Sequence, residues 1–310
     1  MKLNFDELIL SSGGMRGIIF IGALIKLDSI YPLKNFKYLT GSSVGSIILT
    51  MISIGYNLLE IKYIITRLEF ENFQELKIRN LLNDSGLDDG KKFNDLLQAL
   101  FETKNIPKDI TFLQLYNINK KILTLNTANM TSGLVEYMNF RNTPNLSVLK
   151  ALRMSSNIPI LFTPILYNNS YYIDGALLDP YPYDYFKNTT KLGLYIVDNY
   201  EYNFFLNKDV KFIEEKNNFL KYFTNIIKLL YTNYLKNKYK IKKKNTIYFN
   251  LNIENMTFSM DLSTKKSILT IGEKTVNKYF KKLYTKLRKV YLSKKYYFIW
   301  KSNVFSKLYP

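Results

Sequence analysis

A short glycine- and serine-rich run holds the residues best suited to chemistry. Gly41-Ser42-Ser43-Val44-Gly45 matches the pattern G-x-S-x-G and stands between a predicted strand and a predicted helix. In that setting a serine is raised on a sharp turn, and small neighbours let the backbone double back around it. The amides at the start of the following helix then face the charge that develops on a substrate oxygen. We therefore predict that Ser43 is a nucleophile and that Gly41 and Gly45 shape its turn.

Composition limits which base can activate this serine. The 310 residues include no His and no Cys, which excludes a Ser-His-Asp triad, imidazole metal sites and thiolate chemistry. A carboxylate can take the proton if it lies against the hydroxyl in a partly desolvated pocket, because burial raises its pKa. Asp174 ends a strand-like run, and ligand-side residues gather at the carboxyl ends of strands in open α/β sheets. Asp174 is therefore the candidate base, although an ordinary Asp-Gly turn has the same letters.

A second glycine-rich loop, Ser12-Gly13-Gly14-Met15-Arg16-Gly17, also follows a strand-like run. It lacks the spacing of a dinucleotide site and the Lys of a phosphate-binding loop. Glycine permits close approach of backbone N–H donors to a substrate oxygen, so we predict an oxyanion hole. The residues expected to form it are Gly13, Gly14, Met15 and Arg16. We consider two roles for the Arg16 side chain: it stabilises the loop, or it binds a lipid phosphate.

These three motifs, in this order and with Asp174-Gly175-Ala176 as the third, resemble the patatin-like phospholipases. Residues 86–90, 109–112 and 151–159 agree with the same family, and the resemblance spans roughly residues 5–283. One departure is Ser12, which stands where the family often has a further Gly. The resemblance implies an α/β three-layer sandwich with a mostly parallel central sheet. It also implies phospholipase A-type ester cleavage by a Ser43–Asp174 dyad, without a cofactor or a metal.

The elements that must position these motifs can be read from hydrophobic periodicity. Strand-like runs at 8–10 and 36–40 each lead through a glycine-rich turn into an apolar run of helical length, at 18–27 and 47–54, which is typical of a parallel α/β sheet. Helical periodicity also marks 58–78, 91–103, 146–155 and 219–235, and strand-like runs mark 121–128, 135–140, 171–173, 192–197 and 246–253. We predict one acyl hydrolase domain over residues 1–283 and a basic, aromatic C-terminal extension over 284–310.

The positive charge lies almost entirely in the last third of the chain. Residues 1–205 carry 20 Lys and Arg against 19 Asp and Glu, whereas residues 206–310 carry 24 against 6. Such a region faces a polyanion or is a solvated surface enriched in lysine. We expect an anionic membrane surface, in keeping with a phospholipid or other acyl-lipid substrate, and we do not expect nucleic acid. The predicted membrane-surface residues are Lys236, Lys238, Lys240, Lys242, Lys243 and Lys244.

Location follows from two further features. Asp6 and Glu7 stand where a signal peptide would carry positive charge, and no run of residues is long and apolar enough to cross a bilayer. We expect a cytoplasmic protein with peripheral membrane association.

Two other functions fit parts of the sequence. An acyltransferase would use the same acyl-enzyme and pass the acyl group to an alcohol, which product analysis with a competing acceptor would reveal. A non-catalytic basic protein that binds lipid or nucleic acid would explain the lysines and their aromatic neighbours. Labelling of Ser43 by a fluorophosphonate probe separates that function from an enzyme.

Overall fold

The centre of the fold is an eight-stranded, mostly parallel sheet. The computed structural model describes residues 3–73, 75, 77, 85–197, 234, 243–251 and 260–308, with side chains to residue 288. Its parallel strands are, in order across the sheet, β10 (Thr246–Asn250), β9 (Lys191–Val197), β1 (Glu7–Leu10), β2 (Tyr38–Gly41) and β4 (Ile122–Asn129). The antiparallel strands at the far side are β8 (Ser170–Asp174), β7 (Ile165–Tyr167) and β5 (Leu134–Met138), of which β5 and β8 both pair with β4.

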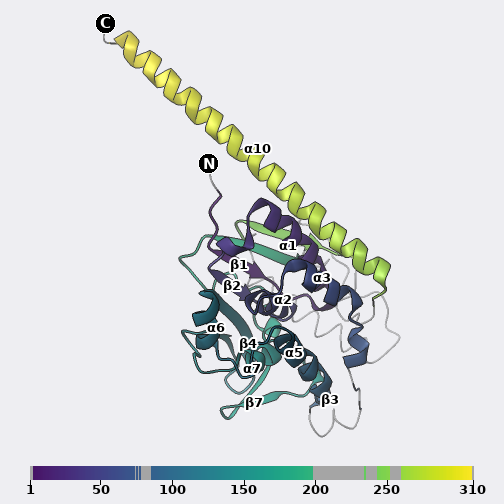
Figure 1. Cartoon of the computed structure of the whole chain (residues 1–310). Helices are drawn as coiled ribbons and strands as arrows, with labels where there is room; N and C mark the ends of the chain where they lie inside the picture. The colour runs from purple at the N-terminus through teal and green to yellow at the C-terminus, as the bar shows by residue number, and fades with distance from the viewer. Residues whose placement is uncertain are drawn as a thin grey trace.

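Alternation along the strands divides the core between the two faces of this sheet. On β1, Leu8 and Leu10 join the main core with the helices, whereas Ile9 packs on the other face with Tyr181 and Tyr195. Adjacent side chains of a strand point to opposite faces, so both faces are apolar where the sheet is covered on both sides. The predicted α/β class with a mostly parallel central sheet is confirmed (Figure 1).

Helices pack against the sheet face that carries the main core. They are α1 (Ile18–Ile30), α2 (Val44–Ser53), α3 (Leu58–Arg67), α5 (Lys91–Thr103), α6 (Phe112–Asn119), α7 (Val148–Ser155) and α10 (Leu262–Leu308). Short 3-10 turns and a separate two-stranded sheet complete the described chain: η1 (Gly14–Gly17), η2 (Leu33–Asn35), η3 (Phe70–Phe73), η4 (Gly175–Leu177), β3 (Gly86–Asp88) and β6 (Ile160–Phe162). The predicted helices at 18–27, 47–54, 91–103 and 146–155 are confirmed, as are strands at all the predicted positions.

One helix prediction is wrong in its length. The helix expected over residues 58–78 ends at Arg67, because Leu68 takes an extended conformation. The freed carbonyls of Thr66 and Leu68 accept hydrogen bonds from Lys265 Nζ, at 3.3 and 2.6 Å. A distant lysine therefore satisfies the end of α3, which local periodicity does not reveal. The helix expected over 219–235 lies outside the described residues, apart from Tyr234.

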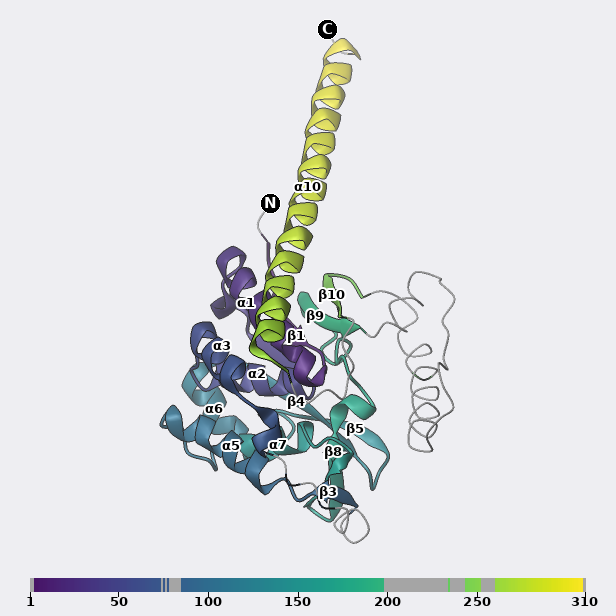
Figure 2. The ribbon, with the colours of Figure 1, turned by 90° about the vertical axis from the view of Figure 1, so that its right-hand side faces the viewer.

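Helix α10 crosses α1 with the two backbones in close approach. A methyl group at Gly22 would lie 1.9 Å from the Leu269 carbonyl oxygen, and one at Gly272 would lie 2.2 Å from the Ile19 carbonyl oxygen. Residues of α10 are buried as far as Phe280. Beyond that point the helix continues without a break and projects from the body (Figures 1 and 2). The helix is continuous across residue 284, and the domain boundary predicted at that residue remains a prediction.

Candidate active site

Ser43 lies on a strained turn between β2 and α2. Its backbone angles are φ 53° and ψ −121°, in a region that residues with a side chain seldom occupy. A methyl group at Gly41 would lie 2.7 Å from the Ser46 amide nitrogen, and one at Gly45 would lie 2.5 Å from the Leu10 carbonyl oxygen. Only glycine fits at either position, which is the physical reason for small residues on both sides of the serine.

Asp174 reaches the same edge of the sheet by a route that the sequence argument did not foresee. It is the last residue of strand β8, as predicted, and β8 runs antiparallel to its neighbour β4. Strand β4 extends past the end of β2, and its Thr127 pairs with Asp174 in the returning strand. Gly175 is required next, because a methyl group there would lie 2.5 Å from Asn126 Oδ1.

The structure brings Ser43 and Asp174 together across 131 residues of sequence. Ser43 Oγ donates a hydrogen bond to Asp174 Oδ2 at 2.5 Å, and the amide of Ala176 donates to Oδ1 at 2.8 Å. Burial raises the pKa of Asp174 to about 7, although both hydrogen bonds favour the ionised form. Such a carboxylate is a much better base than an exposed aspartate, and it is held against a single hydroxyl.

The glycine-rich loop forms part of the same site. Gly14 and Met15 line a cavity together with Ser43. Gly14 has φ 53° and begins the turn η1, and the first amides of a helical turn have no partner within it. Arg16 is buried and its Nε donates to the Gly13 carbonyl oxygen at 3.4 Å. Of its two predicted roles, this contact favours steadying the loop.

The cavity beside Ser43 is almost entirely apolar. It lies between α2, α3 and α5, and representative lining side chains are Ile47 and Met51 of α2, Ile64 and Leu68 of α3, and Leu96 and Leu100 of α5. A pocket of this kind accepts a hydrocarbon chain, since few polar groups would lose water on its entry. The sequence showed the periodicity of these helices but not that their apolar faces meet in front of the serine.

Two buried residues, Arg153 of α7 and Asn157 just after it, are connected to Asp174 by hydrogen bonds. No role was predicted for them from the sequence. Arg153 Nη1 donates to Asn157 Oδ1 at 2.6 Å, while the guanidinium lies over the ring of Phe162, 4.5 Å from its centroid. The Asn157 carbonyl oxygen in turn accepts the Asp174 amide at 2.9 Å. Burial lowers the pKa of Arg153 to about 10. Their spacing of four residues was the one available signal.

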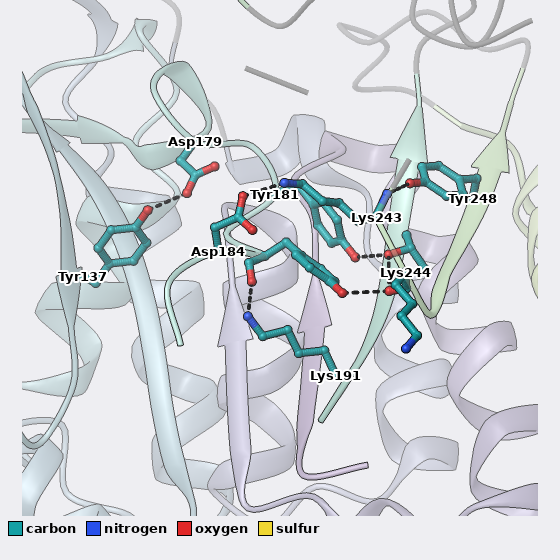
Figure 3. Close-up of polar contacts among 10 residues, drawn as sticks. Tyr137, Asp179, Tyr181, Asp184, Lys191, Lys243, Lys244 and Tyr248 are labelled. Atoms are coloured by element: carbon teal, nitrogen blue, oxygen red, sulfur yellow. Dashed lines mark hydrogen bonds and ion pairs between the residues drawn. The ribbon is translucent and has the colours of Figure 1, made fainter. Parts of the chain in front are cut away.

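The predicted membrane-surface lysines do not join this site. Lys236, Lys238, Lys240 and Lys242 lie outside the described residues. Lys243 and Lys244 precede β10, at the sheet edge opposite Ser43. There Lys243 Nζ pairs with Asp184 Oδ2 at 2.6 Å, and the Lys244 carbonyl oxygen accepts the Tyr183 hydroxyl at 2.8 Å (Figure 3). Within the described ranges, no helix is both long and apolar enough to cross a bilayer.

Comparison with solved structures gives the same fold. The chain resembles VipD from Legionella pneumophila with a TM-score of 0.61 and 16% identity, covering 89% of this chain and 66% of VipD. It resembles the type III effector protein ExoU with a TM-score of 0.52 and 14% identity, covering 90% and 53%. At these identities the likeness concerns the fold alone.

Comparison of sequences gives relatives and a family. A probable lipid hydrolase, 463L of Invertebrate iridescent virus 6, is 33% identical over 185 residues, which are 58% of this chain and 62% of that protein. The uncharacterized protein R571 of Acanthamoeba polyphaga mimivirus is 28% identical over 296 residues, 90% of this chain and 95% of the relative. The family model for patatin-like phospholipases matches residues 8–187, a span that holds the glycine-rich loop, Ser43 and Asp174. The chain belongs to the patatin-like phospholipase family.

Proposed function

We propose that this chain is a lipid acyl hydrolase of phospholipase A type, with Ser43 as nucleophile and Asp174 as base. The observation that carries the proposal is the 2.5 Å hydrogen bond from Ser43 Oγ, which lines an apolar cavity, to a buried carboxylate. Family membership and the relationship to a probable viral lipid hydrolase support the same substrate class.

The proposed reaction has two halves. Ser43 Oγ attacks the ester carbonyl carbon and its proton passes to Asp174 Oδ2, while the Gly14 and Met15 amides stabilise the oxyanion. The bond to the alcohol breaks, and the alcohol or lysolipid leaves with the proton from Asp174. Water then attacks the acyl-enzyme, gives its proton to Asp174, and the fatty acid leaves as Ser43 regains a proton. Every proton transfer uses a group of this chain.

A Ser43→Ala variant tests the proposal. Purified protein is incubated with a phospholipid, and released fatty acid is measured beside labelling by a fluorophosphonate probe. Both signals are expected to disappear in Ser43→Ala and to persist in Ser42→Ala, because Ser42 is the neighbouring buried serine that makes no contact with Asp174 among the described residues. Fatty acid release by Ser43→Ala would overturn the proposal, and absence of both labelling and release in the wild type would favour a non-catalytic protein.

Peripheral contact with an anionic membrane is a separate part of the proposal, supported by the excess of lysine after residue 205. Each cation near an anionic bilayer contributes about 1 kcal/mol, and salt screens this attraction. Substituting Gln for Lys236, Lys238, Lys240 and Lys242 is expected to abolish flotation with phosphatidylserine vesicles. The matched control replaces the exposed residues Lys34, Lys91, Lys108 and Lys120, which removes the same charge elsewhere. Equal loss in both variants, or binding independent of salt, contradicts a localised surface.

A further inference from the structure

The apolar cavity follows helix α2 away from Ser43. Four α2 side chains line it, Val44, Ile47, Ile48 and Met51, and this spacing places them on one face of the helix. Ser43 immediately precedes this face, so Met51 is the lining residue of α2 farthest from the hydroxyl. Helices α3 and α5 supply the two walls. The cavity is therefore a slot with the reacting group at one end.

Contacts beyond Met51 close the other end of this slot. The Tyr56 amide donates to the Met51 carbonyl oxygen at 3.0 Å, and the Tyr56 hydroxyl donates to the Leu100 carbonyl oxygen at 2.9 Å. Tyr56 itself is buried. These bonds tie the floor of the slot to the wall formed by α5.

An ion pair joins the two walls at the same end. Lys104 Nζ lies 2.8 Å from Glu60 Oε1, which connects the residue after α5 to the first turn of α3. The Lys104 ammonium also lies 4.5 Å from the centroid of the Tyr56 ring. The residues beyond Met51 and Leu100 are therefore tied to one another, and the Met51 side chain is buried.

The length of the slot can be compared with that of an acyl chain. Met51 lies seven positions after Val44, which corresponds to a rise of roughly 10 Å along an α-helix. An extended alkyl chain advances roughly 1.25 Å per carbon, given ordinary bond lengths and angles. The slot therefore holds about eight carbons before the chain meets Met51.

We propose that Met51, with Leu100, limits the length of the acyl chain, so that the enzyme prefers acyl groups of about eight carbons to long ones. The proposal rests on the proposed function, because it assigns the slot to the acyl group held by Ser43. A longer chain must bend out of the slot or displace Met51 from its packed position. Either change weakens binding of the transition state, so long-chain esters should have a lower kcat/KM than esters of about eight carbons.

The test measures kcat/KM for p-nitrophenyl butanoate, octanoate, dodecanoate and hexadecanoate at one fixed detergent concentration. The wild type is expected to prefer octanoate. Met51→Ala and Leu100→Ala each open the end of the slot, and each is expected to raise the ratio of dodecanoate to octanoate hydrolysis by about tenfold. Ile48→Phe fills the slot nearer to Ser43 and is expected to move the preference to butanoate.

Met138→Ala is the matched control. Met138 is a buried methionine of β5 outside the cavity lining, so its loss destabilises the fold without altering the slot. Its chain-length profile is expected to match the wild type. The proposal is overturned if the wild type prefers hexadecanoate, or if neither Met51→Ala nor Leu100→Ala changes the ratio. Absence of Ser43-dependent hydrolysis of every ester would instead overturn the proposed function.

Discussion

Two buried carboxyl groups, Glu7 and Asp174, each hold side-chain hydroxyls, and of these hydroxyls the one of Ser43 lines the apolar cavity whereas those of Thr40 and Thr189 do not. Glu7 begins β1, where it accepts hydrogen bonds from the hydroxyls of Thr40 at 2.6 Å and Thr189 at 2.5 Å. Asp174 accepts from Ser43 and from one backbone amide. Burial raises the pKa of both groups. A perturbed pKa by itself therefore marks burial and does not mark a catalytic site.

The difference lies in the hydroxyl that each carboxyl group holds. Thr40 is fully buried in the middle of the sheet, with its backbone in the ladders that join β2 to its neighbours. Ser43 is carried on a strained turn, and it lines the apolar slot. The same pairing of hydroxyl and carboxyl thus stabilises the fold at Glu7, whereas at Asp174 the hydroxyl is open to a substrate.

Removing the charge of Asp174 is expected to have the largest effect. Asp174→Asn keeps the shape but cannot accept the Ser43 proton, so kcat for a soluble ester should fall by about a thousandfold or more. In the wild type, kcat should rise with pH through about 7 as Asp174 ionises. Initial rates of ester hydrolysis, measured for both proteins at several pH values on either side of 7, check both expectations. A variant that retains turnover, or a rate that is flat below neutral pH, contradicts the assignment.

Asp174→Asn should also change how the free energy of unfolding depends on pH. The folded-state pKa of Asp174 lies above its unfolded value, so the native state binds the extra proton and its free energy of unfolding falls as pH rises toward about 7. Asn does not titrate, so melting temperatures of Asp174→Asn should decline less between acidic and mildly alkaline pH. A steeper decline than in the wild type would show that ionised Asp174 is not costly to bury.

Arg153 is expected to have an intermediate effect, as a positioning residue. Arg153→Met fills the same space beside Phe162 but removes the hydrogen bond to Asn157, whose carbonyl oxygen holds the Asp174 amide. We expect kcat to fall about tenfold with KM nearly unchanged. Arg141→Met, at an exposed arginine, is the control and should leave both constants unaltered. A change confined to KM would place Arg153 in substrate binding.

Glu7→Gln should have the smallest effect on activity. Glu7 holds Thr40 and Thr189, neither of which lines the cavity, so kcat should stay within about twofold of the wild type. Because the pKa of Glu7 is also raised, the free energy of unfolding should depend less on pH in this variant. Thermal melts at several pH values measure the second effect. A large loss of kcat would mean that the bonds of Glu7 are coupled to the active site.

The comparison also separates what sequence could predict from what it could not. The turn around Ser43 could be predicted from the sequence, because the motif, the preceding strand and the following helix are contiguous. Asp174 was a candidate base from the absence of His and from its place at the end of a strand-like run, and the family resemblance implied its pairing with Ser43. The structural route, through an antiparallel strand that returns past the end of β2, leaves no local signal.

Long-range contacts account for most of the features that sequence missed. The end of α3 depends on Lys265, nearly two hundred residues away. The great length of α10 was missed because, among the residues whose side chains are described, its buried positions end at Phe280 and are set by its crossing with α1. The short strands β3, β6 and β7 have three residues each, which is too few for a period of two to be recognised.

The single carboxylate oxygen that touches Ser43 sets the order of events in the proposed reaction. One atom, Asp174 Oδ2, must receive a proton from Ser43, return it to the departing alcohol, and receive another from water. The alcohol and the water therefore occupy the same place in turn. The first product has to vacate before hydrolysis begins, so lysolipid or alcohol that accumulates should compete with water for the acyl-enzyme and send the reaction backwards.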